Sequence, residues 1–283
     1  MHEQLAEIRD QQRASWDKFS SGWRKWDTYT MAFLQPAGDA IVSMLSPQPH
    51  HHVLDIAAGT GEPGLTLAGL VPEGKVVLTD LSDDMLNVAR EKVSERGLGN
   101  VQVMAADVSE LPFDDNTFDA VSCRMGFMFF PDMELAAKEM ARVLKPGGTV
   151  ATSVWNAADK NYWVTAIMDQ IKLKMDVPTP PPGAPGMFRC AKEGLIADLF
   201  RSVGLREVAD KQIDGVMTYE SIDVYWTMFN EVGAPIVAAM SEASDAVREE
   251  IRQAVYADIK RRLPSEPVEF GTSAWVVSGR KPA

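Results

Sequence analysis

The sequence predicts an α/β fold with a doubly wound parallel sheet, and three observations support this. Short apolar runs of strand type alternate with helical patterns from Val53 to Val154, as in a parallel sheet covered by helices on both faces. The first run, 53–57, breaks into a glycine turn at Gly59 and Gly61. Acids lie at three successive strand ends, namely Asp55, Asp80 and Asp107. Ligands bind at the carboxyl ends of strands in such sheets, so these acids mark the expected site.

Each further element follows from its local pattern. The strands of the regular part are predicted at 53–57, 75–79, 101–106, 118–123 and 149–154. Ser82 and Asp132 are good helix caps and predict helices after the second and fourth strands. The Lys-Pro-Gly-Gly run at 145–148 ends the later helix, because proline and glycine do not continue it. Later patterns predict a helix over 192–203 and strands over 205–213 and 274–278.

Three segments lie outside this alternation. Residues 1–46 carry aromatic residues at helical spacing: Trp16, Phe19, Trp23, Trp26, Tyr29 and Phe33. Such a stripe is typical of simple packing, and its place ahead of the sheet also suits a cover for a ligand. The insert at 155–190 holds five prolines between Pro178 and Pro185, which predicts a surface loop or strap. The insert at 216–263 has two apolar stripes and predicts helices.

Composition narrows the class of protein. The 283 residues carry a net charge of -12, which argues against a nucleic-acid partner because phosphate binding needs a basic face. No apolar run reaches the roughly 18 residues of a membrane span. The polar stretch 1–12 does not resemble a signal peptide. Two cysteines, Cys123 and Cys190, give no disulfide framework. We therefore expect a cytoplasmic globular protein.

Two kinds of cofactor fit the glycine turn. Gly59-x-Gly61-x-x-Gly64 is, read loosely, a dinucleotide fingerprint with Asp80 as the ribose-binding acid. The alternative is the S-adenosylmethionine (SAM) turn, in which an acidic strand residue precedes Gly-x-Gly. Asp55 favours SAM, because a carboxylate there attracts a sulfonium and an ammonium but repels a pyrophosphate.

Residues at the next two strand ends can be matched to parts of SAM. Asp80 can accept hydrogen bonds from both ribose hydroxyls, with Leu81 and Met85 beside the adenine. Asp107 can accept from the exocyclic amine of adenine, and the Val108 N–H can donate to a ring nitrogen.

Arg124 and the histidines are interpreted by position. Arg124 follows the fourth strand and is either a surface arginine or the partner of the methionine carboxylate, and both alternatives stay open. The histidine triplet 50–52 precedes the first strand, at the amino edge of the sheet, so we expect no histidine base. The cysteines and histidines lack the spacing of zinc ligands, and no metal is expected.

Four motifs resemble the class I SAM-dependent methyltransferases, most closely the group around the ubiquinone/menaquinone C-methyltransferases. They are Val-Leu-Asp-x-Ala-x-Gly-Thr-Gly from Val53, Gly-Lys-Val-Val-Leu-x-Asp from Gly74, Leu-Pro-Phe-x-Asp-Asn-Thr-Phe-Asp from Leu111, and Arg-Val-Leu-Lys-Pro-Gly-Gly from Arg142. The resemblance implies a doubly wound, Rossmann-like methyltransferase sheet of seven strands with an antiparallel last strand, which suits 274–278. It also implies SAM as the cofactor and S-adenosylhomocysteine as its product.

The residues and the resemblance together give an expected organisation and site. Residues 1–46 are expected to form an N-terminal helical cap segment, and 47–283 a methyltransferase domain with cap inserts at 155–190 and 216–263. The expected SAM-binding residues are Tyr29, Asp55, Ala57, Gly59, Thr60, Gly61, Asp80, Leu81, Met85, Ala106, Asp107, Val108, Arg124 and Phe129. No catalytic residue is assigned.

The methyl acceptor is less constrained. Quinone methyltransferases carry Phe-Gly-Leu-Arg-Asn after the fourth strand, where this chain has Met-Gly-Phe-Met-Phe at 125–129. Since Met128 and Phe129 replace the polar pair, we expect a small, largely apolar or aromatic acceptor, with O-, N- and C-methylation all open. The alternatives are a quinone-biosynthesis C-methyltransferase and a SAM-binding protein without catalysis. The oligomeric state is open, a homodimer included.

Overall fold

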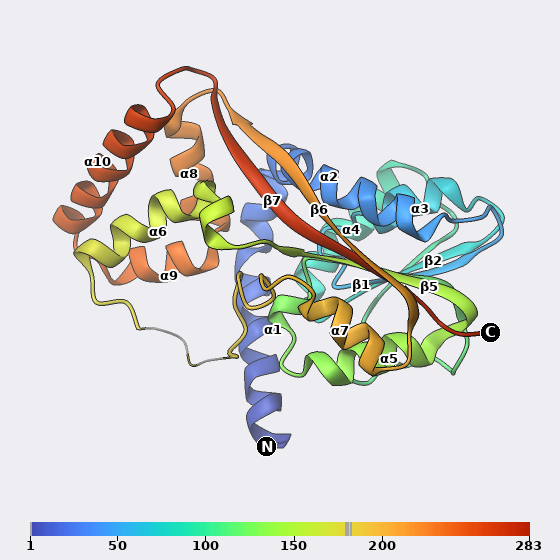
Figure 1. Cartoon of the computed structure of the whole chain (residues 1–283). Helices are drawn as coiled ribbons and strands as arrows, with labels where there is room; N and C mark the ends of the chain where they lie inside the picture. Colours follow the sequence, from blue (N-terminus) through green and yellow to red (C-terminus); the bar gives the residue numbers. More distant parts are fainter. Residues whose placement is uncertain (1, 179–180, 182) are drawn as a thin grey trace.

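The computed structural model describes residues 2–178, 181 and 183–283, and within them the chain forms a seven-stranded sheet of order β3-β2-β1-β4-β5-β7-β6 (Figure 1). The strands are β1 (His52–Ile56), β2 (Lys75–Asp80), β3 (Val101–Ala105), β4 (Phe118–Arg124), β5 (Leu144–Trp155), β6 (Arg206–Tyr219) and β7 (Val268–Arg280). Strands β1 to β5 pair in parallel, and β7 is antiparallel to both β5 and β6. This confirms the doubly wound sheet with an antiparallel last strand.

The order of strands reverses next to β1. The chain runs from β1 outward through β2 to β3 and then returns to place β4 on the other side of β1. Leu54 of β1 pairs with Val77 of β2 and with Val121 of β4, and all three side chains are buried. The loops after β1 and β4 therefore diverge at one point of the carboxyl edge, where such sheets bind ligands.

Helices cover both faces of the sheet. One face carries α2 (Asp27–Leu45), α3 (Gly64–Leu70) and α4 (Asp83–Glu95), and the other carries α5 (Met133–Val143) and α7 (Leu195–Ser202). The predicted caps are confirmed: Ser82 Oγ accepts from the Met85 N–H at 3.1 Å, and Asp132 Oδ1 accepts from the Leu135 N–H at 2.9 Å.

A second group of helices lies where β6 ends and β7 begins. We call it the helical unit: α6 (Tyr162–Lys174), α8 (Ile222–Val232), α9 (Ala234–Glu242) and α10 (Asp245–Arg262). The antiparallel pair of β6 and β7 runs from the sheet into this unit, where Tyr225 of α8 stacks on Phe270 of β7 at 4.5 Å between ring centroids. The N-terminal helix α1 (His2–Lys25) passes between the unit and the sheet (Figure 1). Among the described residues, no helix is long and apolar enough to cross a membrane.

The expectation of a loop or strap for the whole of 155–190 is wrong at its centre, where α6 forms. Trp163, Ile167 and Ile171 recur every four residues, and burial of that stripe in the core stabilises the helix. The prolines that suggested a loop all follow the helix, and three of the segment's residues, Thr179, Pro180 and Pro182, lie outside the described residues.

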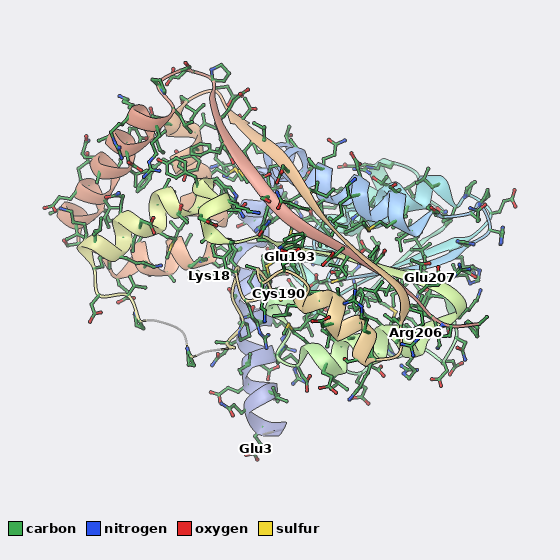
Figure 2. All side chains as sticks on the ribbon, in the orientation of Figure 1. Glu3, Lys18, Cys190, Glu193, Arg206 and Glu207 are labelled. Atoms are coloured by element: carbon green, nitrogen blue, oxygen red, sulfur yellow. The ribbon has the colours of Figure 1, made fainter. Side chains whose placement is uncertain are left out.

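The described part of the segment after α6 returns to the sheet. The Gly186 N–H donates to the Met128 carbonyl at 3.0 Å, beside the short helix η1 (Phe127–Phe129) that follows β4. Cys190, labelled in Figure 2, places its Sγ 3.5 Å from Met133 Sδ at the start of α5. The segment is therefore attached to the loop after β4.

The predicted limits of the last two strands were also too short. Strand β6 runs to Tyr219 rather than Ile213, so 216–219 belong to the sheet and not to the helical insert. Strand β7 starts at Val268 rather than Ala274. Polar residues such as Asp214 interrupt the apolar pattern of β6, which is why its length was underestimated. The two strands nevertheless pair along the extra length, up to Tyr219 and Val268, so their main-chain groups are hydrogen-bonded to each other.

Candidate functional site

The turn between β1 and α3 has a backbone that requires glycine. Gly59 and Gly61 have φ values of 52° and 109°, and Ala57 shares the left-handed region at 54°. A Cβ on Gly61 would lie 2.7 Å from Leu65 Cδ1, and one on Gly64 would lie 2.1 Å from Leu78 Cδ2. The absence of side chains lets α3 approach the sheet closely and leaves backbone N–H groups near the strand ends.

Asp55 holds this turn from inside the sheet. Its side chain is fully buried, Oδ2 accepts from the Gly64 N–H at 2.9 Å, and Oδ1 accepts from Ser122 Oγ at 2.6 Å. Burial raises the pKa of Asp55 to about 7, against the opposing effect of the Ser122 hydrogen bond. A buried carboxylate of this kind becomes more stable when a cation is brought beside it.

Asp80 links the glycine turn to the end of β2. Its Oδ2 accepts from the Gly59 N–H and its Oδ1 from the Ser82 N–H, both at 2.9 Å. Burial raises the pKa of Asp80, and the backbone donors oppose that shift. Each carboxylate oxygen can accept a second hydrogen bond, so the expected ribose hydroxyls remain compatible with these contacts.

Residues predicted beside Asp80 lie around the same edge. Met85 Cε is 3.3 Å from where a Cβ on Gly59 would be, so this side chain covers the glycine turn. Thr60 is buried within the turn, and Leu81 is half-buried after Asp80. The Ala106 N–H donates to the Asp80 carbonyl at 3.0 Å, which brings the end of β3 next to the end of β2.

Asp107 is paired with the N-terminal helix. Its Oδ1 accepts from the Ser109 N–H at 2.8 Å, and Oδ2 lies 3.4 Å from Arg9 Nη1 of α1. Val108 beside it is buried. The expected adenine-binding acid is therefore engaged by a cation, a contact that the sequence reasoning did not foresee.

Arg124 is half-buried against α2 rather than a surface arginine. Its Nη2 lies 3.6 Å from Met31 Sδ, and its Nη1 is 3.8 Å from the position of a Cβ on Gly38. Burial lowers the pKa of Arg124, and attraction to Asp55 opposes that shift. Within the part of the chain that the structure describes, Arg124 makes no ion pair. A desolvated guanidinium without an anion is suited to bind a carboxylate.

Helix α1 crosses the site at several points. Asp17 Oδ1 accepts from Ser82 Oγ at 2.6 Å, and Arg24 pairs with Glu91 of α4 at 2.7 Å. Trp16 meets Phe129 of η1 edge-on at 5.4 Å between centroids. The aromatic stripe in the sequence suggested a cover, but the polar contacts made by Asp17 had no signal in a single sequence because they depend on tertiary placement.

Tyr29 is the member of the predicted set that lies in a different environment. Its hydroxyl donates to Glu220 Oε2 at 2.5 Å, and its ring stacks on Tyr219 at 5.6 Å. The hydrogen bond to Glu220 raises the pKa of Tyr29. The structure thus places Tyr29 at the border with the helical unit, and no described contact joins it to the glycine turn.

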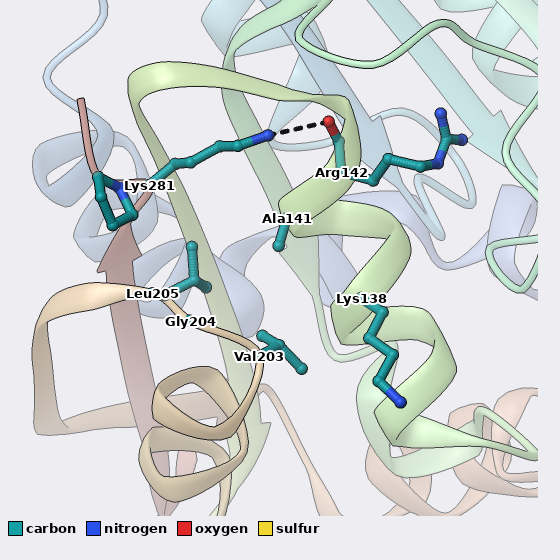
Figure 3. Close-up of a pocket in the computed structure, with 8 residues that line it drawn as sticks. Lys138, Ala141, Arg142, Val203, Gly204, Leu205 and Lys281 are labelled. Atoms are coloured by element: carbon teal, nitrogen blue, oxygen red, sulfur yellow. Dashed lines mark hydrogen bonds between the residues drawn. The ribbon is translucent and has the colours of Figure 1, made fainter.

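A surface cavity of about 290 Å³ lies elsewhere, beside the start of β5 at the amino edge (Figure 3). Three basic residues line it, but they already have partners. Arg142 Nε is 2.7 Å from Glu139, and Lys281 Nζ donates to the carbonyls of Arg142 and Leu144 at 3.1 and 2.8 Å. The cavity is therefore separate from the strand-end acids, and its cations serve the fold.

Comparison with known proteins agrees with this geometry. Residues 53–148 match the family model described as a methyltransferase domain. Over 100 residues the chain is 50% identical to the ubiquinone/menaquinone biosynthesis C-methyltransferase UbiE of Idiomarina loihiensis, an alignment that covers 35% of this chain and 40% of that relative. The chain thus spans less than half the length of the curated relatives it matches.

Solved structures with the same fold cover more of the chain. The YcgJ protein of Bacillus subtilis superposes with a TM-score of 0.59 over 87% of this chain and 98% of its own, at 21% identity. The phosphoethanolamine N-methyltransferase 2 of Haemonchus contortus, solved with SAM, superposes with a TM-score of 0.52 over 87% of this chain and 52% of its own, at 18% identity. Residues 53–148 of this chain are therefore similar to a methyltransferase domain, and the chain has the Rossmann-like fold of these solved structures.

Proposed function

We propose that this chain transfers the methyl group of SAM to a small, largely apolar or aromatic metabolite. The observation that carries the proposal is the row of acids at the carboxyl edge, with Asp55 behind the glycine turn, Asp80 beside it and Asp107 on the next strand. A dinucleotide bound at the same turn would have its phosphates directly in front of the buried carboxylate of Asp55, which disfavours that alternative.

The residues present fit SAM on two structural grounds. Arg124 is a desolvated cation without an ion-pair partner among the described residues, as a site for the methionine carboxylate requires. Asp55 is a buried acid that a nearby cation would stabilise. The half-exposed Asp80 would hold the ribose, and Asp107 the adenine amine once Arg9 moves away.

SAM supplies an electrophilic methyl group, and this chain's task is to align the acceptor and exclude water. Among the described residues, no histidine lies at the carboxyl ends of the strands. Burial raises the pKa of Tyr219 and of Tyr225, which keeps both hydroxyls protonated, so neither is available as a base. Alignment in an apolar chamber, rather than a strong base, is the contribution that these residues favour.

Binding and turnover test the proposal separately. Calorimetry should show binding of SAM and S-adenosylhomocysteine and none of NAD. Incubation with methyl-labelled SAM and a panel of aromatic alcohols, amines and phenols should then give a labelled product. Binding of NAD without SAM contradicts the proposal, and SAM binding without any product favours a non-catalytic SAM-binding protein.

The N-terminal segment and the helical unit are proposed to form a cap that orders over the cofactor and acceptor. Helix α1 contacts the site through Asp17 and Trp16. At its other end, Lys25 and the adjoining Trp26 both donate to Glu231 of α8 at 2.7 Å. Ligand binding at the edge is thereby coupled to α8. Hydrogen exchange with S-adenosylhomocysteine should show increased protection in 12–34 and 219–232 as well as at 59–61. Protection limited to the glycine turn contradicts the coupling.

A second candidate is a quinone-biosynthesis C-methyltransferase, favoured by the relatives named for ubiquinone and menaquinone biosynthesis. Met128 is fully buried in η1, and Phe129 packs against Trp16, so neither supplies the polar pair of that group. Labelled methyl groups found on carbon, after incubation with a demethylated naphthoquinol, would favour this candidate. Label on oxygen or nitrogen of other acceptors would favour the main proposal.

A further inference from the structure

Trp23 of α1 carries a buried polar group that nothing in the described chain satisfies. Within the described residues, Trp23 Nε1 is buried without a hydrogen-bond partner, although the indole N–H is an obligate donor. Trp26, just beyond the end of α1, behaves differently, because its Nε1 donates to Glu231. A buried donor left unpaired lowers the stability of the fold, so a ligand that supplies the missing acceptor would gain affinity from this hydrogen bond.

The surroundings of Trp23 connect it to the loop beside the proposed methyl site. Its ring lies 6.0 Å from that of Trp16, which in turn meets Phe129 of η1. Strand β4 leads into η1 and pairs with β1, and Ser122 of β4 binds Asp55 directly. On the other side, Gly22 lies against α8, with a Cβ position 2.6 Å from the Glu231 carbonyl. Trp23 thus stands between the loop after β4 and the helical unit.

The other three buried polar side-chain atoms without partners among the described residues lie in different environments. Ser153 of β5 pairs with Arg124 in the sheet and belongs to the proposed carboxylate side of the site. The guanidinium of Arg189 already donates through Nη1 to the Phe130 carbonyl, and that of Arg252 is engaged by Asp223. Trp23 is the one of the four whose single polar atom is unpaired and whose ring is in an aromatic cluster next to η1.

We propose that Trp23 is a specificity-determining residue whose indole N–H donates a hydrogen bond to an oxygen of the methyl acceptor. This deepens the proposed function and rests on it. The acceptor class is then an aromatic or alicyclic ring that carries a carbonyl or hydroxyl oxygen and packs beside the rings of Trp16, Trp23 and Phe129, which meet edge-on. A plain hydrocarbon would make the same ring contacts but leave the indole N–H unpaired.

The test uses two probes with the same ring system, 1-tetralone and tetralin, titrated into the protein loaded with S-adenosylhomocysteine. The native protein should bind 1-tetralone about 5- to 10-fold more tightly than tetralin, as expected for one buried hydrogen bond. Trp23→Phe should remove that preference, and Trp16→Phe, which keeps the Trp23 N–H, should weaken both probes by the same factor.

Equal affinities in the native protein, binding of neither probe, or an unchanged preference in Trp23→Phe overturns the inference. Thermal unfolding and S-adenosylhomocysteine affinity are measured on each variant, and both should stay close to native in Trp23→Phe. If the native protein fails to bind S-adenosylhomocysteine, it is the proposed function that fails. If it binds S-adenosylhomocysteine without preferring 1-tetralone, only the role of Trp23 fails.

Discussion

The cofactor edge and the helical unit are built from different interactions. At the edge, each acid accepts from at least one main-chain N–H: Asp55 from Gly64, Asp80 from Gly59 and Ser82, and Asp107 from Ser109. At the border of the helical unit, side chains bind other side chains, as between Tyr29 and Glu220, or stack as rings. Main-chain groups are fixed by the fold, whereas side chains can change rotamers. The edge is therefore preformed for one ligand, and the unit can adapt to another.

Helix α1 is the element that belongs to both regions. Its polar contacts reach the edge at Asp107 and Ser82, and its glycine contact reaches α8 at Glu231. Variants that damage one region and spare the other therefore test whether this division holds.

The largest effect is expected for Asp80→Asn. Loss of a charged acceptor to two ribose hydroxyls should cost about 1.5–3 kcal/mol of SAM binding, or roughly 10- to 150-fold in affinity by calorimetry. Since Asp80 also accepts from two backbone N–H groups, the variant should unfold at a lower temperature than the native protein. Asp84→Asn removes an exposed charge from the next helix and should change neither quantity. An unchanged affinity in Asp80→Asn removes this residue from the site.

Asp55→Asn should weaken SAM binding by about tenfold, because a neutral amide does not attract the cationic end of SAM. The pKa of Asp55 is about 7 in the folded chain and about 3.9 when unfolded. Its contribution to folding stability is thus greatest below about pH 4 and is lost as the pH rises to about 7. Binding of a cation favours the ionised form, so SAM binding near pH 6 should release protons.

Calorimetry in buffers of different ionisation enthalpy measures that release. Asp55→Asn should reduce that release. Asp119→Asn is the matched control, because Asp119 lies at the start of β4, where it binds Lys145 and the His52 N–H. An equal release in native and Asp55→Asn protein would show that Asp55 does not face the cation.

Gly22→Ala should damage the helical side and spare the edge. The added Cβ would lie 2.6 Å from a backbone carbonyl of α8, and such overpacking costs about 1–3 kcal/mol of stability. SAM affinity should fall by less than about fivefold, because binding at the edge is coupled to α8, while hydrogen exchange in 222–232 speeds up. Gly69→Ala is the control, because a Cβ there meets nothing within 4 Å in α3 and should stabilise the chain by up to about 1 kcal/mol. A large loss of SAM affinity in Gly22→Ala would mean that the two regions are one unit.

The smallest effect is expected for Arg9→Ala, and it has the opposite sign. Arg9 and Asp107 are partly exposed, and a pair of this kind contributes at most about 1 kcal/mol. Its removal frees Asp107 and should raise SAM affinity by less than about fivefold, with a difference that shrinks at high salt. Arg13→Ala removes a charge from the same helix, one that among the described residues pairs with Asp10 alone, and it should leave SAM affinity unchanged. A weaker affinity in Arg9→Ala would show that Arg9 helps to hold the cofactor.

The sequence predicted the regular sheet well because local patterns decide it. Strand β1 is a short apolar run before glycines with positive φ, and the Ser82 cap sets the start of α4. Helix α6 was not predicted because the prolines that follow it favour a loop, although Trp163, Ile167 and Ile171 have helical spacing. The pairing of Arg9 with Asp107 and the unpaired Trp23 N–H depend on where α1 lies in space, and one sequence carries no signal for that.

The place of β7 has a consequence for how the molecule is made. This strand lies between β5 and β6 in the sheet, yet it follows both of them, and all of α8 to α10, along the chain. On the ribosome, β6 therefore emerges without a neighbour to pair with, and β5 keeps one bare side until residues 268–280 appear. Vectorial synthesis should complete the glycine turn and its acids first, and the nascent chain would then carry exposed strand edges that invite aggregation or chaperone binding. A ligand for the early-formed half could then be bound before the second half has closed.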